Sequence, residues 1–156
     1  MFTHAAEMQA EIILTNLFSP VKRALSYKNF SWVTFSDPEV ASFGLREEEI
    51  DVPYDRIVKD FTDVRSRIDE TNGRIVFYAA KGRILGGTLI CPEAGEVMQE
   101  LSLAHQEKIH LRDLLKKTYA YPVRARAVKE ALSDYLHKEV SPLKRSLMRL
   151  YFRFSF

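Results

Sequence analysis

Few side chains in this 156-residue chain could do chemistry, and they are far apart in the sequence. Cys91 is the only cysteine, which excludes an intrachain disulfide, a thiolate zinc site and a redox pair of cysteines within the chain. Its ordinary role would be a buried structural thiol. His4 lies near the start of a helix, where a histidine is more often a surface or capping residue than a ligand. Arg126 could bind an anionic group through two parallel hydrogen bonds, but an exposed helical arginine is the commoner case.

Tyr121 is the remaining candidate, and Pro122 follows it. Because the residue before a proline is pushed out of the α region, we expect residues 118–122 to be extended. A phenol with an unperturbed pKa of about 10 is mostly protonated at neutral pH, so it can donate a hydrogen bond but cannot cycle a proton as imidazole does. An aromatic ring that only fills an interface explains Tyr121 equally well.

The composition indicates one globular domain and no special partner. The 23 basic and 21 acidic residues give a net charge of +2, which is too small to indicate nucleic-acid binding. No stretch approaches the roughly 20 apolar residues of a membrane span, and the N-terminus lacks the basic-then-apolar order of a secretory signal. We therefore expect a cytoplasmic protein.

The elements that must position these residues centre on a hairpin. Residues 74–80 and 83–90 are rich in strand formers, and Gly82 in the turn between them is free to take a positive φ. The pair Gly86-Gly87 interrupts the second strand, which indicates that another backbone or a helix approaches closely there. The hairpin is therefore expected to belong to a covered sheet.

A helix is expected after the hairpin, with Pro92 at its first position. Its apolar residues recur at helical spacing and predict a face that packs on the sheet: Ala94, Val97, Leu101 and Ala104. Elsewhere the patterns predict a helix over residues 1–18 with Thr3 as a candidate N-cap, strands at 32–35 and 54–61 with a turn at 36–39, short helices at 47–49 and 111–117, and a helix over 123–138.

The spacing of apolar and basic residues in 141–156 predicts a basic amphipathic helix, with Leu147 and Leu150 on its apolar face and Arg145 and Arg149 on another face. We favour packing of the apolar face on the domain or on a dimer partner. A helix that lies on a membrane surface is the weaker alternative, and nucleic acid is a remote third.

Four runs of sequence, in order and in register, resemble a known family. They are Asp37 to Gly44, Gly82 to Gly87, Ala94-Gly95-Glu96 and Tyr121-Pro122. Together they are similar to the C-terminal dimerisation domain of the pyridine nucleotide-disulfide oxidoreductases, which include dihydrolipoamide dehydrogenase and mercuric reductase. The resemblance implies an α+β fold, with a mostly antiparallel sheet of about five strands and helices on one side, and a homodimer whose two-fold axis runs near the helix after Pro92. Part of that helix's apolar face would then be covered by the partner.

The resemblance also implies three regions and two cofactors. Residues 1–29 would be a remnant of the flavin domain and its connection, 30–140 the dimerisation domain, and 141–156 the C-terminal helix. Thr3, His4 and Ala5 are similar to the helix start that meets the flavin edge. FAD and NAD(P) serve the parent family, but this chain contains no Gly-x-Gly-x-x-Gly turn to hold a pyrophosphate, so we expect none bound to the chain alone.

At the family's catalytic signature this sequence departs from the pattern. The family's His-Pro pair and the glutamate five residues after its histidine form an acid/base dyad that crosses to the partner's active site, and here Tyr121 and Arg126 stand at the two positions. Mercuric reductases also lack the histidine, so we expect greater similarity to them. The peptide bond before this proline is often cis in the family, and we expect the same at Tyr121-Pro122.

The resemblance therefore predicts that this chain is the interface domain of a flavin-dependent NAD(P)H oxidoreductase and that it is inactive alone. It would dimerise and contact the parent's flavin and nicotinamide domains. The alternative from another class is a free-standing, non-enzymatic dimeric interaction module.

Overall fold

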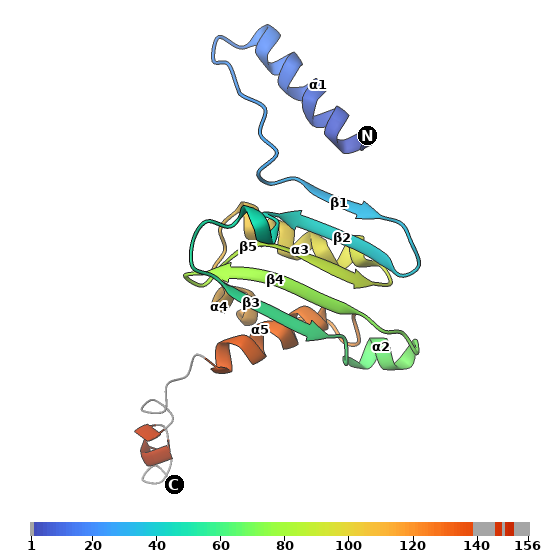
Figure 1. Ribbon diagram of the computed structural model, residues 1–156, viewed down its shortest axis with the longest axis vertical. Coiled ribbons are helices and arrows are strands. Elements are labelled where there is room, and N and C mark those ends of the chain that lie inside the picture. The colour runs from blue at the N-terminus through green and yellow to red at the C-terminus, as the bar shows by residue number, and fades with distance from the viewer. Residues whose placement is uncertain (1, 139–145, 148, 152–156) are drawn as a thin grey trace.

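The computed structural model describes residues 2–138, 146–147 and 149–151. Its centre is a five-stranded antiparallel sheet in the order β1-β2-β5-β4-β3 (Figure 1). The strands are β1 Ser31–Thr34, β2 Glu39–Gly44, β3 Asp55–Asp60, β4 Arg74–Ala80 and β5 Arg83–Cys91. The helices are α1 Thr3–Phe18, α2 Val64–Ile68, α3 Ala94–Gln106, α4 Leu111–Lys116 and α5 Arg126–Lys138, with a 3-10 turn at Glu47–Glu49. The predicted α+β fold is confirmed.

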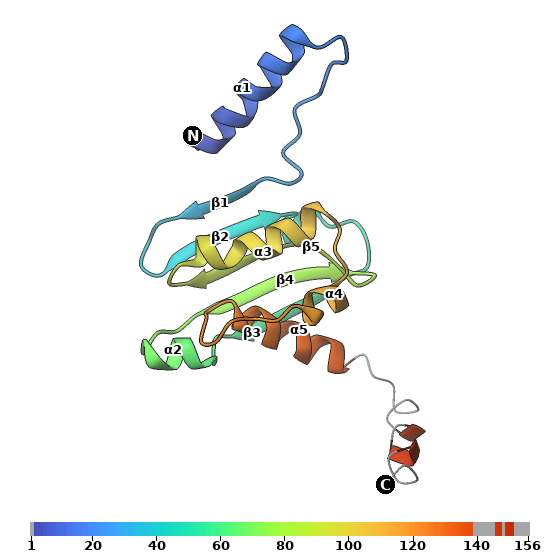
Figure 2. The same cartoon turned by 180° about the vertical axis from the view of Figure 1, so that it is seen from behind.

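Two layers form the body of the protein. Helices α3 and α5 both cover the face of the sheet that Figure 2 shows, α3 over β2 and β5 and α5 near β3. The side chains between the layers are fully buried, among them Phe77 of β4, Leu89 of β5 and Leu101 of α3. Helix α1 stands apart from both layers, beyond β1, and has no buried residue.

The predicted hairpin is confirmed at its turn and at its glycines. Lys81 and Gly82 have φ values of 50° and 72°, as a two-residue turn that follows the strand twist requires. A Cβ on Gly86 would lie 2.1 Å from the Leu45 carbonyl oxygen, and one on Gly87 would lie 2.7 Å from Cβ of Phe77. Both positions therefore exclude a side chain, because the neighbouring backbone is too close.

The structure corrects three predicted helix starts. Strand β5 runs to Cys91, and Glu93 at φ 57° holds the cap of α3, so Pro92 lies outside the helix that it was expected to open. Thr3 is the first residue of α1 and not its N-cap, a position that Phe2 holds without a side-chain hydrogen bond. Helix α5 begins at Arg126 and not at residue 123.

Strand β2 lies where the sequence predicted part of a turn. The residues around Pro38 do form the bend, and the Asp37-Pro38 bond is cis, but Glu39 already pairs with Cys91 of β5. The strand places Ala41 and Phe43 in the core. Helix α2 was not predicted either: it is five residues long, and the Asp63 side chain caps it by accepting from the Ser66 amide at 3.1 Å.

The expectation that a partner covers part of the apolar face of α3 is wrong for its four predicted residues. Ala94, Val97, Leu101 and Ala104 are at most 4% exposed within the single chain, because the sheet itself covers them. Most of the C-terminal segment 141–156 lies outside the described residues. Among the residues that are described, no helix is long and apolar enough to cross a membrane.

Candidate functional site

Tyr121 lies on the loop between α4 and α5, and its side chain is exposed at 66%. Its peptide bond with Pro122 is cis, as the resemblance led us to expect. The Arg126 guanidinium carbon lies 5.3 Å from the centroid of the Tyr121 ring, so the two residues form a cation–π pair. The structure therefore brings together the two side chains that sequence analysis singled out, at the first turn of α5.

This pair presents hydrogen-bond donors and a positive charge. Within the described part of the chain, neither the Tyr121 hydroxyl nor the Arg126 guanidinium hydrogen-bonds to another side chain. Both keep their donors available. An acid/base dyad of imidazole and carboxylate would have the opposite character, since each of its members can accept a proton.

Two residues before Tyr121, the chain is anchored by a buried phenol. Tyr119 is 6% exposed, and its hydroxyl donates to Glu100 Oε1 of α3 at 2.5 Å. Lys117 also donates to the Glu100 carboxylate and lies over the Tyr119 ring, with Nζ 4.4 Å from the centroid. Burial, and then the hydrogen bond to Glu100, raises the pKa of Tyr119. The phenol is therefore held neutral, as a hydrogen-bond donor.

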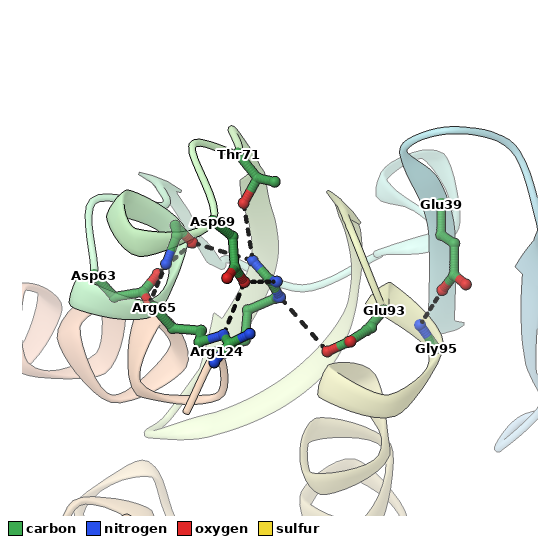
Figure 3. Close-up of polar contacts among 9 residues, drawn as sticks. Glu39, Asp63, Arg65, Asp69, Thr71, Glu93, Gly95 and Arg124 are labelled. Atoms are coloured by element: carbon green, nitrogen blue, oxygen red, sulfur yellow. Dashed lines mark hydrogen bonds and ion pairs between the residues drawn. The ribbon is translucent and has the colours of Figure 1, made fainter. Parts of the chain in front are cut away.

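Three residues after Tyr121, a buried guanidinium forms a second anchor, which sequence analysis missed. The Arg124 side chain is 7% exposed, and its Nη2 donates to Asp69 Oδ2 at 2.7 Å (Figure 3). Its Nη1 donates to Thr71 Oγ1 at 3.0 Å, and its Nε lies 3.7 Å from Glu93 Oε2 without a hydrogen bond. Arg124 thus joins the loop to the end of α2 and to the start of α3.

Cys91 lies in the core beside this anchor and is inert. It is fully buried, and burial raises the pKa of its thiol to about 12, although the charge of Arg124 acts in the opposite direction. A thiol so rarely ionised at neutral pH is neither a nucleophile nor a metal ligand. In the described residues, no group of three or more histidine, cysteine, aspartate or glutamate side chains could hold a metal ion.

The second predicted site, Thr3, His4 and Ala5, lies at the start of α1. The His4 ring stacks on Phe30 with centroids 4.7 Å apart, and its Nε2 lies 2.8 Å from the Ser31 carbonyl oxygen. A recess of about 710 Å³ opens beside Thr3 and His4 and reaches Met98 and Gln99 of α3. Ala5 is only half-buried. The N-terminal motif thus stands at the β1 edge, whereas α5 stands near β3 (Figure 1).

The recess beside His4 has room for the edge of a flat ring system. At the start of α3, the Gly95 amide already donates to Glu39 Oε2 at 3.1 Å, so a side-chain carboxylate holds the place that a phosphate would need (Figure 3). Any pyrophosphate would therefore have to be held by residues other than these.

Comparison with known proteins places this fold in one family. The sequence profile described as "Pyridine nucleotide-disulphide oxidoreductase, dimerisation domain" matches residues 30–132. Leghemoglobin reductase of Glycine max is 32% identical over 156 residues, covering 95% of this chain and 29% of that protein. Dihydrolipoyl dehydrogenase of Halobacterium salinarum is 28% identical over 152 residues, covering 93% and 32%.

Solved structures agree on the fold. LpdA from Mycobacterium tuberculosis superimposes with a TM-score of 0.72 at 23% identity, over 83% of this chain and 30% of that one. The Cu(II) complex of RclA, an HOCl-induced flavoprotein disulfide reductase from Escherichia coli, gives 0.76 at 19% identity, over 85% and 32%. The chain spans about 30% of the length of these relatives.

Proposed function

The chain belongs to the dimerisation-domain family of the pyridine nucleotide-disulphide oxidoreductases, and from this premise we propose that it is the self-associating part of an FAD-dependent NAD(P)H oxidoreductase similar to dihydrolipoamide dehydrogenase. The observation that carries the proposal is the profile match over residues 30–132, which spans the whole sheet and α3. The same span has one complete hydrophobic core, as an independently folded interface unit needs.

The face of the sheet opposite α3 and α5 supports self-association. A cross-strand row runs over it through Trp32, Ser42, Thr88, Val76 and Val58. No α-helix covers this row in the described structure (Figure 1). Its centre is tied by a 2.9 Å hydrogen bond between the hydroxyls of Ser42 and Thr88, and Val58 is 44% exposed. A mixed row of this kind suits contact with a second copy of the chain.

Sedimentation of the purified chain tests this proposal. At micromolar concentration we expect a species of twice 18.1 kDa. The variant Val58→Glu places a charge in the row and should weaken the dimer, whereas the control Phe18→Glu changes a side chain that is 85% exposed on α1 and should not. A wild-type chain that sediments only at 18.1 kDa would overturn the proposed self-association.

In the assembled enzyme we propose that Tyr121 and Arg126 form an edge of the partner's substrate site. The support is the exposure of Tyr121, the available donors of both side chains and their places at the family's His and Glu positions. Because this edge presents hydrogen-bond donors and a positive charge, it would orient an anionic or electron-rich group. The mercuric reductase-like character of this edge stays a prediction.

FAD and NAD(P) would be held by parts of the parent enzyme that lie outside this chain, and we propose that the chain alone is inactive. The flavin supplies electron transfer when it is bound, and His4 and its neighbours would contact only its edge. The test is the visible spectrum of the purified chain together with an NADH and NADPH oxidation assay. Stoichiometric FAD on the chain would contradict this part of the proposal.

A second candidate is a free-standing, non-enzymatic dimeric module. It is favoured by the core, because the sheet, α3 and α5 bury one continuous apolar cluster within the single chain. The DNA upstream of the first codon separates the two candidates. An in-frame segment that encodes a Gly-x-Gly-x-x-Gly turn and a cysteine pair supports the enzyme, and unrelated upstream sequence supports the module.

A further inference from the structure

The loop that carries Tyr121 has an unusual distribution of burial. Tyr119 and Arg124 are 6% and 7% exposed, whereas Tyr121 between them is 66% exposed. An exposed loop tip ordinarily rests on side chains that are themselves exposed and mobile. Here the tip stands between two buried polar side chains, and each of them is tied to a different part of the fold.

The two anchors hold the loop against rigid elements. Tyr119 is bound to Glu100 in the middle of α3, and the Lys117 and Lys129 ammonium groups lie over its ring at 4.4 and 5.7 Å. Arg124 is bound on the other side, to Asp69 and Thr71 after α2. Because α3 packs on the sheet with four fully buried residues, the first anchor is as fixed as the core itself.

Stability alone does not account for the second anchor. Taking a guanidinium out of water is costly, and buried ion pairs are often no more stabilising than apolar side chains of the same volume. Arg124 also leaves its Nε without a hydrogen bond, although the atom is buried. What the network does provide is direction, since two nitrogens of one planar group, Nη1 and Nη2, donate to fixed points. Such a network specifies where the loop lies.

We propose that Tyr119 and Arg124 are positioning residues that hold the Tyr121 side chain in a single orientation, ready to enter a site completed by another chain or domain. This inference rests on the proposed role of Tyr121, because the geometry matters only if the exposed phenol meets a ligand. The orientation of Tyr121 is set within this chain, before any partner binds.

The test is fluorine NMR on the full chain labelled with 3-fluorotyrosine, in which Tyr121→Phe identifies the Tyr121 line. The wild type should give one Tyr121 line whose chemical shift differs from that in the urea-unfolded chain, because rapid rotamer exchange would average the shift while keeping the line narrow. The double variant Asp69→Asn with Arg124→Met removes both charges together, so that neither is left buried alone, and the Tyr121 shift should move toward the unfolded value. Tyr119→Phe removes the other anchor and should change the Tyr121 signal in the same direction. Arg124→Lys keeps the charge but loses the planar guanidinium group, so its Tyr121 signal should lie between those of the wild type and the double variant.

The control is Arg46→Gln, which breaks the 2.9 Å ion pair with Glu49 in the 3-10 turn. It should leave the Tyr121 line unchanged, and the Tyr54 and Tyr78 lines should stay constant in every anchor variant that folds. A wild-type Tyr121 shift equal to that of the urea-unfolded chain would overturn the inference. So would a Tyr121 shift that does not move in the anchor variants while urea shows that they have lost stability. If the double variant unfolds, Tyr119→Phe and Arg124→Lys decide the question. The readout needs neither a dimer nor activity, so the proposed function can fail separately.

Discussion

The two segments that carry the family's site motifs are held in opposite ways. Residues 2–29 form α1 and a connection, α1 has no buried residue, and the His4 motif is joined to the sheet through Ser31 and Phe30. The Tyr121 loop is pinned on both sides by side chains that are less than 10% exposed. The His4 motif lies on a helix outside the core. The Tyr121 motif lies on a loop whose neighbouring side chains are buried in the core.

The difference indicates which part of the site this chain completes by itself. The Tyr121 edge has its supporting residues within the described chain, from α2, α3 and α5. The His4 edge has an exposed apolar side on its own helix, where Leu14 and Leu17 are 57% and 68% exposed. A surface of this kind is normally covered by another part of a protein. The His4 segment is therefore the half that needs another surface to cover it.

The largest expected effect tests the anchored half. Arg124→Ala leaves the Asp69 carboxylate partly buried without its main partner, and should lower the free energy of unfolding by about 3 kcal/mol. His4→Ala removes one hydrogen bond at the surface and should cost less than about 1 kcal/mol. Urea unfolding followed by circular dichroism measures both. Equal losses in the two variants would remove the contrast between the segments.

Alkaline pH gives the next largest effect. Burial raises the pKa of Cys91 from its ordinary value of 9.0 to about 12, and also raises that of Tyr119. A pKa that is higher in the folded protein means that stability is complete below the unfolded value and is lost as the pH rises through the folded one. The Cys91 contribution should therefore fall between pH 9 and 12, by about 1.4 kcal/mol at pH 10, and that of Tyr119 only above about pH 10.

Urea midpoints measured from pH 7 to 11 check this dependence. Cys91→Ala should flatten the first part of the curve, and Tyr119→Phe should flatten the part at higher pH. Removal of residues 1–26 should leave the shape of the curve unchanged, because both groups lie in the body of the protein. A wild-type midpoint that is constant up to pH 11 would contradict the burial of these two groups in solution.

Much of the body could be predicted because its signals are local. The strands at 74–80 and 83–91, the Gly82 turn and the apolar stripe of α3 follow from residue type and period. Strand β2 was missed because Asp37 and Pro38 are turn formers, and only pairing with β5 shows that Glu39 is already in the sheet. Helix α2, with five residues, is too short to show a helical period.

The supports of the candidate site could not be predicted in the same way. Arg124 hydrogen-bonds to Thr71 and Asp69, which lie 53 and 55 residues earlier in the chain. Nothing in its local sequence separates a buried guanidinium from the exposed ones at Arg65 or Arg74. Tyr121 and Arg126 were found because a family pattern marks their positions. The residues that orient them needed the fold.

A smaller effect is expected from removal of the N-terminal segment. Without residues 1–26 the sheet and its helices keep every buried side chain, so the free energy of unfolding should change by less than about 1 kcal/mol. His105 still lies 3.3 Å from the Lys28 carbonyl oxygen in that shorter chain. Urea unfolding of the two chains makes the comparison. A loss of several kcal/mol would show that α1 belongs to the cooperative unit.

The smallest expected effects fall on Tyr121 and Arg126 themselves. Tyr121→Phe removes a hydroxyl that has no hydrogen-bond partner in the described residues, and should leave the free energy of unfolding unchanged within about 0.5 kcal/mol. Arg126→Ala removes the cation–π contact of a half-buried side chain and should cost about 0.5 kcal/mol. Urea unfolding beside Tyr119→Phe provides the matched comparison. The loss of unfolding free energy should then be much larger for Tyr119→Phe than for Tyr121→Phe, because Tyr119 is buried in the core and Tyr121 is exposed. If Tyr121→Phe proves as destabilising as Tyr119→Phe, the phenol of Tyr121 is a packing residue and the substrate edge must be sought elsewhere.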